Sequence, residues 1–216
     1  MSDADSFIQE VTEEVRQDRM FRLWKKYAPF VIGALLLVIA GTAGWSWYKQ
    51  WQIEKARELG GRFLATDIAS VEAQEKLAAE VEGPARLVAR LRLAAAKALA
   101  GDAAGAAALY REIAAEPGLE PLYADFARLQ AVRVAAGSLA AEEAIAELEP
   151  LVAEGRPYRL LALELRAAVK LNSGDVEGAH EDLRAVLNDP GATRTLRERA
   201  RAMLLASGGE LSVEGG

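Results

Sequence analysis

The hydrophobic pattern of the chain is dominated by residues 27–48, a stretch of 22 residues without a charge. As an α-helix this stretch measures about 33 Å, slightly more than the hydrocarbon core of a bilayer at roughly 30 Å. Lys25 and Lys26 precede it and Lys49 follows it. Amphipathic rings gather at the headgroup level of membranes. The tryptophans of the chain lie at the two ends of the stretch: Trp24, Trp45, Trp47 and Trp51. The pattern predicts a single transmembrane helix.

Two other interpretations of residues 27–48 stay open on sequence grounds. A buried helix of a water-soluble domain is disfavoured because no charge interrupts the run and because tryptophans flank both ends. A cleaved signal peptide would use the small residues before Gly44, but the 26 residues that precede the span hold six acids. Such a tail differs from the short basic start of a signal peptide. We therefore expect a retained signal anchor.

Basic residues near the predicted span indicate its orientation. Residues 16–26 hold five of them and residues 49–62 hold four, a bias that favours a cytoplasmic N-terminus. Residues 1–26 would form a cytoplasmic tail in which acids come first and bases last, an order that complements a helix dipole. A frayed, solvated tail is the alternative. Long trailing domains cross the membrane regardless of charge, so we expect the C-terminal domain on the outer side.

Small residues mark one face of the predicted membrane helix. Gly33, Ala40 and Gly44 are spaced by seven and four residues, which places them on the same side of a helix. Small side chains allow the backbone of a second helix to approach closely. These three residues are therefore a candidate helix-packing face, although glycine is frequent in membrane helices in general.

Helical spacing of apolar residues continues through residues 49–83, the expected link to the C-terminal domain. Gly60 and Gly61 are a predicted weak point, or hinge, of the first helix in this link. A second helix is expected over residues 71–81, because polar residues that can cap it come before and Pro84 follows.

From residue 84 onward the chain contains an internal repeat with an offset of 73 residues. Residues 94–106 and 167–179 share the skeleton AAxK, three residues, GD, two residues, GA. The glycine of GD would end a first helix in the left-handed conformation, and the aspartate would cap the start of a second helix. The final alanine, Ala106 or Ala179, is small where the two helices touch. The offset fits two repeats of the class of about 34 residues plus a short insertion.

The rest of the repeat region also favours helices. Between the two copies, residues 119–136 and 139–154 predict a divergent middle pair. Thr193 is expected to cap a last helix over residues 194–206, and the glycine-rich end 207–216 is expected to be disordered. Helix formers are abundant and β-branched runs are rare outside the predicted span. The predicted fold is all-α: an N-terminal single transmembrane helix followed by an α-solenoid.

This pattern resembles the tetratricopeptide repeat. Both copies have its Gly-Asp turn, a small residue five positions after that glycine, a bulky residue nine positions after it, and a closing proline, Pro117 or Pro190. They lack its usual aromatic residue in the first helix, where Arg90 and Leu163 stand. The resemblance implies a tetratricopeptide-repeat-like solenoid over residues 84–206, an architecture that binds protein partners of many kinds.

The whole chain resembles the YfgM-like family. The resemblance is carried by an acidic-then-basic tail, LWKKYAPFVIG at the start of the span, GWSWYKQWQ at its end and RPYRLLALELRA in the repeats. It implies a bacterial inner-membrane protein with a periplasmic repeat domain. It also implies association with the SecYEG translocon and with membrane-anchored periplasmic chaperones such as PpiD, during protein export. A membrane tether for envelope assembly or cell division, without translocon contact, is the alternative function.

Composition limits the remaining functions. The net charge is −6, and the chain from residue 63 onward has 17 basic against 24 acidic residues, which disfavours nucleic-acid binding. There is no cysteine and one histidine, His180. Thiol chemistry is therefore excluded, and no metal-ligand motif, nucleophile elbow or phosphate-binding loop occurs. We expect no enzyme activity, no cofactor, no metal and no small-molecule substrate, and a surface position for His180.

The charge of the repeats differs between first and second helices. The first helices of the two good copies are basic, whereas the second helices are acidic overall. In repeats of this kind the first helices line the concave face, so the pattern predicts a basic groove that attracts acidic or carboxylate-ended segments. The candidate partner-binding residues are Arg86, Arg90, Lys97, Arg159, Arg166 and Lys170. The alternative is that these charges pair between adjacent helices and leave no net field.

Overall fold

The structure is a computed structural model that describes residue 35 and residues 37–210. The described residues form helices joined by turns, with no strand among them. The chain divides into two compact units, Met1–Arg62 and Phe63–Gly216. The observed architecture of the described part is therefore all-α, as predicted.

The predicted transmembrane span overlaps the described residues only in part. Residues 27–34 and 36 lie outside them, and so do the tail 1–26 and Gly33 of the candidate packing face. Within the described part of the chain, no helix is both long and apolar enough to cross a membrane. The transmembrane helix and its orientation therefore stay predictions.

One continuous helix covers residues 37–65. Ala40 and Gly44 of the candidate packing face are exposed on it. The helix passes through Gly60 and Gly61 without interruption, so the predicted weak point does not break it. Glycine inside a helix costs only about 1 kcal/mol relative to alanine, and a long helix can tolerate that cost at two positions.

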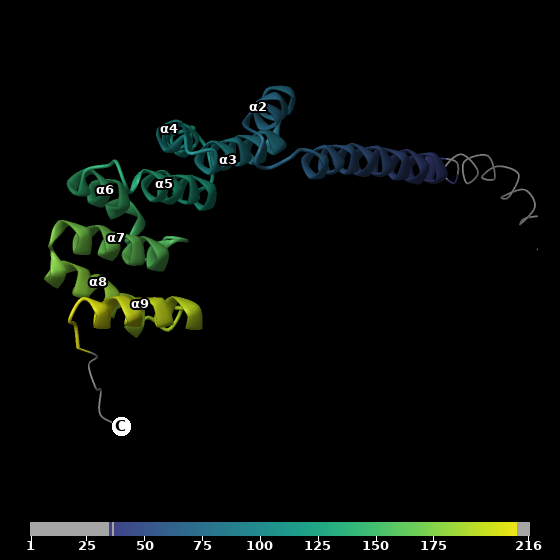
Figure 1. Cartoon of the computed structure of the whole chain (residues 1–216). Helices are drawn as coiled ribbons and strands as arrows, with labels where there is room; N and C mark the ends of the chain where they lie inside the picture. The colour runs from purple at the N-terminus through teal and green to yellow at the C-terminus, as the bar shows by residue number, and fades with distance from the viewer. Residues whose placement is uncertain (1–34, 36, 211–216) are drawn as a thin grey trace, which may run out of the picture. The chain divides into compact units, whose positions relative to one another are not determined.

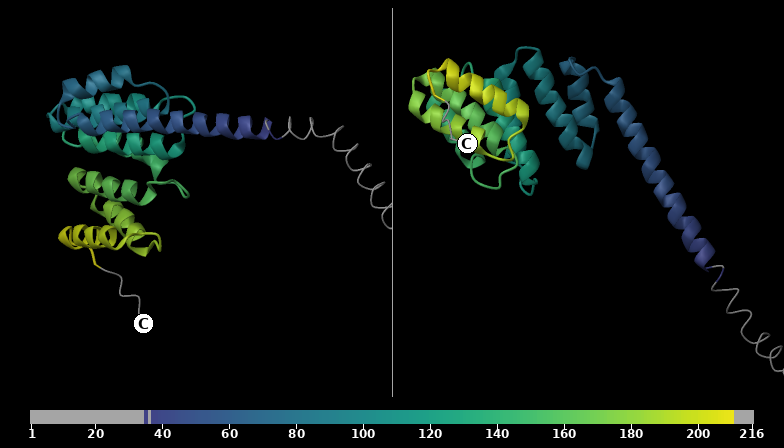
Figure 2. Two further views of the ribbon diagram at one scale, coloured as in Figure 1. Left: turned by 90° about the vertical axis from the view of Figure 1, so that its right-hand side faces the viewer. Right: turned by 90° about the horizontal axis from the view of Figure 1, so that it is seen from below.

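The second unit consists of helices that pack on one another in the order of the sequence (Figures 1 and 2). They are α2 (Val71–Glu80), α3 (Pro84–Leu99), α4 (Ala103–Ala114), α5 (Pro121–Ala135), α6 (Ala141–Leu148), the short 3₁₀ helix η1 (Glu149–Leu151), α7 (Arg159–Ser173), α8 (Val176–Asn188) and α9 (Arg194–Ala206). Each helix contacts the next, and α7 also contacts α9. In the terms used above, α3, α5 and α7 are first helices and α4, α6 and α8 are second helices.

The apolar core follows the same order. One buried cluster joins α3, α4 and α5 around Tyr110 and Ile113. The next joins α5, α6, η1 and α7 around Leu148 and Leu151. A further cluster joins α7, α8 and α9 around Leu183. Since each cluster shares a helix with the next, the core continues along the repeats, as in solenoids whose repeats contact only their neighbours.

The Gly-Asp turns predicted for the two copies are confirmed. Gly174 has a φ of 88°, in the left-handed region that glycine adopts without steric cost. The Asp175 carboxylate caps α8 by accepting a hydrogen bond from the backbone N–H of Gly178 at 3.0 Å. The first copy has the same arrangement, in the same order, at Gly101, Asp102 and Gly105.

The glycine inside α4 and the one inside α8 have a role that the sequence pattern did not indicate. A Cβ atom on Gly178 would lie under 3.0 Å from the Asp175 carboxylate, closer than real Cβ atoms approach other atoms. Gly105 has the same relation to Asp102. Glycine is unfavourable in helices, so its presence at these positions is explained by the space that the cap needs.

The second helix of the middle pair is shorter than predicted. The pattern favoured a helix over residues 139–154, whereas α6 covers Ala141–Leu148 and continues only as the 3₁₀ turn of Glu149–Leu151. Pro150 explains the difference, because proline has no backbone N–H and its ring clashes with the carbonyl group four residues earlier.

The predicted last helix is confirmed, but the residues after it are more ordered than expected. Thr193 accepts a hydrogen bond from the N–H of Leu196 and caps α9. Residues 207–210 then close the helix, with the N–H of Gly209 donating to the Leu204 carbonyl at 2.8 Å. The remaining residues of the C-terminus, 211–216, lie outside the described residues.

His180 takes part in this C-terminal closure. It is half-buried, not on the open surface as expected, and its Nε2 lies 2.8 Å from the Ser207 Oγ. A Cβ atom on Gly209 would come within 3.0 Å of the His180 ring, so the chain end packs closely against α8. This contact could not be predicted from the residues next to His180, because Ser207 lies 27 residues away in the sequence.

Replacing Gly178 with alanine tests the coupling between cap and helix. In the wild type, Gly178→Ala gains about 1 kcal/mol of helix propensity and loses about as much from the displaced cap, so we expect little change in stability. In an Asp175→Ala background no cap is left, and the same substitution should stabilise the chain by about 1 kcal/mol. Chemical denaturation of the four chains measures both effects; equal effects in the two backgrounds would contradict the coupling.

Candidate functional site

An apolar hollow of about 290 Å³ lies on the face that α5, α7 and α9 share. Its lining comes from these helices and from Tyr158, the residue that precedes α7: Phe126, Leu129, Gln130, Arg133, Tyr158, Leu161, Glu164, Leu165, Ala168, Arg199 and Met203. No second helix contributes to it. The hollow therefore lies on the side that the first helices and α9 present together, away from α6 and α8.

Sequence spacing explains how these side chains meet. On α5 the residues Phe126, Gln130 and Arg133 are separated by four and three positions, which places them on one helix face. On α7 the residues Leu161 and Leu165, with Ala168, have the same spacing. The hollow is thus formed by one face of α5 and one face of α7, together with α9.

Two further hollows adjoin the apolar one along α7. At the N-terminal end of α7 lies a hollow of about 720 Å³, which we call the polar hollow because three arginines and two acids line it. It shares Tyr158, Leu161 and Arg199 with the apolar hollow. At the C-terminal end of α7 lies a small hollow of about 240 Å³, which shares Leu165 and Ala168. Because neighbouring hollows share lining residues along this helix, we refer to the three hollows together as the α7 groove. The helix itself has 15 residues and is about 22 Å long.

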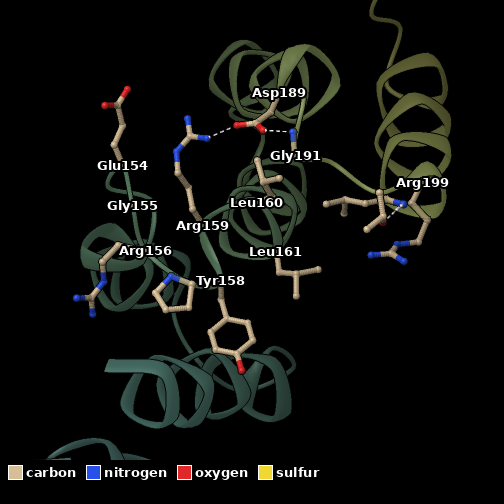
Figure 3. Close-up of a pocket in the computed structure, with 13 residues that line it drawn as sticks. Glu154, Gly155, Arg156, Tyr158, Arg159, Leu160, Leu161, Asp189, Gly191 and Arg199 are labelled. Atoms are coloured by element: carbon tan, nitrogen blue, oxygen red, sulfur yellow. Dashed lines mark hydrogen bonds and ion pairs between the residues drawn. The ribbon is translucent and has the colours of Figure 1, made fainter. Parts of the chain in front are cut away.

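The polar hollow is rich in arginine (Figure 3). The guanidinium group of Arg159 points to Asp189 and donates a hydrogen bond to its Oδ2 at 2.7 Å (Figure 3). Arg156 pairs with Asp125 of α5, a fully buried carboxylate. This pair anchors the loop before α7 to α5. The arginines of this hollow therefore already have carboxylate partners within the domain.

The apolar hollow has one cation on α9 and one on α5. Arg199 of α9 donates two hydrogen bonds to the Glu164 carboxylate of α7, both at 2.6 Å. Arg133 of α5 is exposed. Burial raises the pKa of the Tyr110 phenol, and the positive charge of nearby Arg133 opposes part of that rise. The two cations thus differ, because Arg199 is held by an acid whereas Arg133 stands near a neutral phenol.

The predicted groove residues of α3 lie apart from the α7 groove. Arg90 pairs with Glu112 of α4 at 3.2 Å and also with Glu116, which follows that helix. Lys97 pairs with Glu75 of α2 at 3.0 Å. Both cations therefore pair with acids of the repeat unit itself. Arg86, also predicted, is exposed in the first turn of α3.

The predicted residues of α7 behave in a similar way. Arg166 and Lys170 meet on Asp182 of α8, with N–O distances of 2.6 Å and 3.0 Å. Arg166 also pairs with Glu149 at 2.6 Å. Hydrogen bonding to Asp182 raises the pKa of Arg166 above its usual value, against the effect of burial. Of the six predicted residues only Arg159 lines the α7 groove, in the polar hollow.

These pairs follow the alternative given above, in which charges pair between adjacent helices. Whether any of the six residues contacts a partner stays a prediction. Sequence reasoning missed the apolar stripe and Arg133, although the spacing of Phe126, Gln130 and Arg133 on one helix face was a signal for them. Among residue 35 and residues 37–210, no group of three or more His, Cys, Asp or Glu side chains could hold a metal ion.

The pair of cations on Asp182 should contribute measurably to stability. Asp182 is 4% exposed, so Asp182→Asn leaves Arg166 and Lys170 without their shared charge, and we expect a loss of about 1.5–3 kcal/mol. Glu198→Gln is the control, because it breaks an exposed i,i+4 pair with Arg194 that contributes about 0.3–0.5 kcal/mol. Urea denaturation measures both, and similar losses for the two variants would contradict the assignment.

Comparison with known proteins places this architecture in a family. None of the curated proteins and none of the solved structures compared with the chain matches it. The family model described as a tetratricopeptide repeat-like domain matches residues 22–204, most of the chain, including the helix over 37–65 and nearly all of the repeat unit. The chain therefore belongs to the tetratricopeptide repeat-like domain family.

Proposed function

We propose that this protein is a membrane-anchored scaffold of the bacterial inner membrane that binds protein partners in the periplasm through its α7 groove. The observation that carries the proposal is the groove itself, whose central apolar hollow lies between α5, α7 and α9 of a tetratricopeptide repeat-like domain. Solenoids of stacked helix pairs present extended concave surfaces, and they use these surfaces to bind proteins. The proposal includes no catalytic step and no cofactor.

Exposed apolar residues near the start of the described helix support the anchor. Leu37, Val38 and Ile39 are 75%, 62% and 54% exposed. Large aliphatic side chains are unfavourable in water, and a bilayer would cover them. Further along, Lys55 lies 3.9 Å from the centre of the Trp51 ring. A lysine over a tryptophan is the type of contact expected where a membrane helix leaves the lipid.

The proposed partners are the SecYEG translocon and a PpiD-like chaperone. This step rests on the resemblance of the tail, the span and the repeats to the YfgM-like family. The acidic balance of the repeat unit fits a protein partner better than a nucleic acid. A membrane tether that acts in envelope assembly or division would have the same anchor and the same groove, so partner identity has to be decided by experiment.

A reporter enzyme that is active only outside the cytoplasm tests the proposed topology. Fused after Gly209, near the end of the described residues, it should be active in bacterial cells, because the proposal puts the repeat unit in the periplasm. The same reporter fused before residue 1 should be inactive and serves as the control. Inactivity of the C-terminal fusion, with the fusion protein present in full length, would contradict the proposed topology.

Site-specific photocrosslinking in cells tests the proposed partners. A photoreactive amino acid at Leu161, which is 38% exposed in the α7 groove, should give crosslinks to translocon or chaperone subunits. Val176 is the matched control, because this aliphatic residue is 40% exposed but begins a second helix outside the groove. Crosslinks from position 161 only to envelope-assembly or division proteins would support the alternative function. Equal crosslinking from both positions would contradict a role for the groove.

A further inference from the structure

The α7 groove contains a cation that no acidic side chain neutralises. Arg133 lines the apolar hollow and is exposed, and it has no ion-pair partner within the part of the chain that the structure describes. Arg199, the other cation of this hollow, is held by two hydrogen bonds to Glu164. The arginines of the polar hollow have the carboxylate partners given above. A charge that a ligand could pair with is therefore available at Arg133.

The surroundings of Arg133 are mainly apolar. Leu129, Leu165 and Met203 line the same hollow, together with Leu161. At about 290 Å³ the hollow lies at the lower end of the range of roughly 300–1,000 Å³ for small-molecule pockets. Such a volume suits a few side chains of a bound segment rather than a whole cofactor. The hollow shares lining residues with its two neighbours along α7, so a segment longer than the hollow meets a further hollow at each end.

We propose that the segment bound in the α7 groove is an apolar stretch of a protein partner that carries an acidic side chain, and that this carboxylate pairs with Arg133. The inference rests on the proposed function of the groove. It adds the chemistry of the partner: large apolar residues that fill the hollow, and one Asp or Glu placed to reach the α5 side.

Desolvation makes this chemistry selective. A segment that fills the hollow removes water from Arg133, and a guanidinium group that loses water without gaining an acceptor is unfavourable. An apolar segment without an acid is therefore disfavoured, and one with a lysine at the same place is repelled. A carboxylate satisfies the guanidinium with two parallel hydrogen bonds, a geometry that arginine favours.

Other occupants fit these features less well. A nucleic acid would need several cations along its phosphates, whereas the apolar hollow offers one unpaired cation among the described residues. A second copy of the chain would bury the apolar surface without requiring an external acid. We therefore assign the groove to an acidic, apolar protein segment and treat a second copy as an outcome of the test.

Selection from a random library of displayed peptides identifies a probe. The full chain is reconstituted in lipid nanodiscs, because detergent could occupy the apolar hollow. Recovered peptides should share large apolar residues and at least one Asp or Glu. Leu161→Asp should abolish binding of a recovered peptide, since it places a charge in the groove. Peptides that bind the Leu161→Asp variant unchanged would overturn the proposed function of the groove and this inference with it.

A charge exchange then tests the pairing itself. With the labelled peptide in a fluorescence anisotropy assay, Arg133→Glu should weaken binding at least about tenfold, as expected for loss of a charge-assisted contact. Replacing the acid of the peptide with lysine should weaken binding to the wild type and restore binding to the Arg133→Glu variant. Arg128→Glu is the control, because Arg128 lies on the same helix but lines none of the three hollows.

The possible results separate the two proposals. Binding that needs Leu161 but tolerates Arg133→Glu overturns the inference and leaves the proposed function of the groove standing. Failure of the lysine peptide to restore binding to Arg133→Glu also overturns the pairing. Sedimentation shows whether the chain forms a dimer. If it does, and if the Arg133→Glu variant is monomeric, the groove binds a second copy of the chain and the inference is overturned.

Discussion

The close pairing of each first helix with the second helix that follows it is the constraint on which the groove depends. Ala179 of α8 is fully buried, and a side chain this small lets α7 and α8 approach closely. At that contact, Arg166 and Lys170 of α7 turn to Asp182 of α8. The basic face of α7 is thus occupied by its own pair, and another face, with Leu161, is left to form the groove.

Features that depend only on residues close together in the chain could be predicted from the sequence. The caps depend on residues close together in the chain, so Asp175 and Thr193 were found from pattern alone. The last helix has the predicted bounds for the same reason. Pro150 was a local signal as well, but it was outweighed by the helical spacing around it, and the predicted second helix of the middle pair came out too long.

The groove could not be predicted in the same way, because it depends on which face of each helix meets its neighbour. The first helices α3 and α7 each carry a basic face and an apolar face, and the charges alone did not reveal which one turns inward. The answer lies in pairs far apart in the chain, such as Arg90 with Glu116 and Arg199 with Glu164. The aromatic residue that usually sets the register is missing at position 90. Consequently the apolar hollow contains none of the six residues chosen by charge.

The central claim is that a protein partner covers the α7 groove in the cell. The chain has no cysteine, so single cysteines at Leu161 and Val176, two positions of similar exposure, can report coverage. The measurement is the rate of alkylation by a membrane-impermeant maleimide, in intact cells with a permeabilised outer membrane and in the purified chain. If a partner covers the groove, the cysteine at position 161 is alkylated more slowly in cells than in the purified chain. The cysteine at position 176 is then alkylated at the same rate in cells and in the purified chain. Equal rates at position 161 in cells and in the purified chain would contradict it.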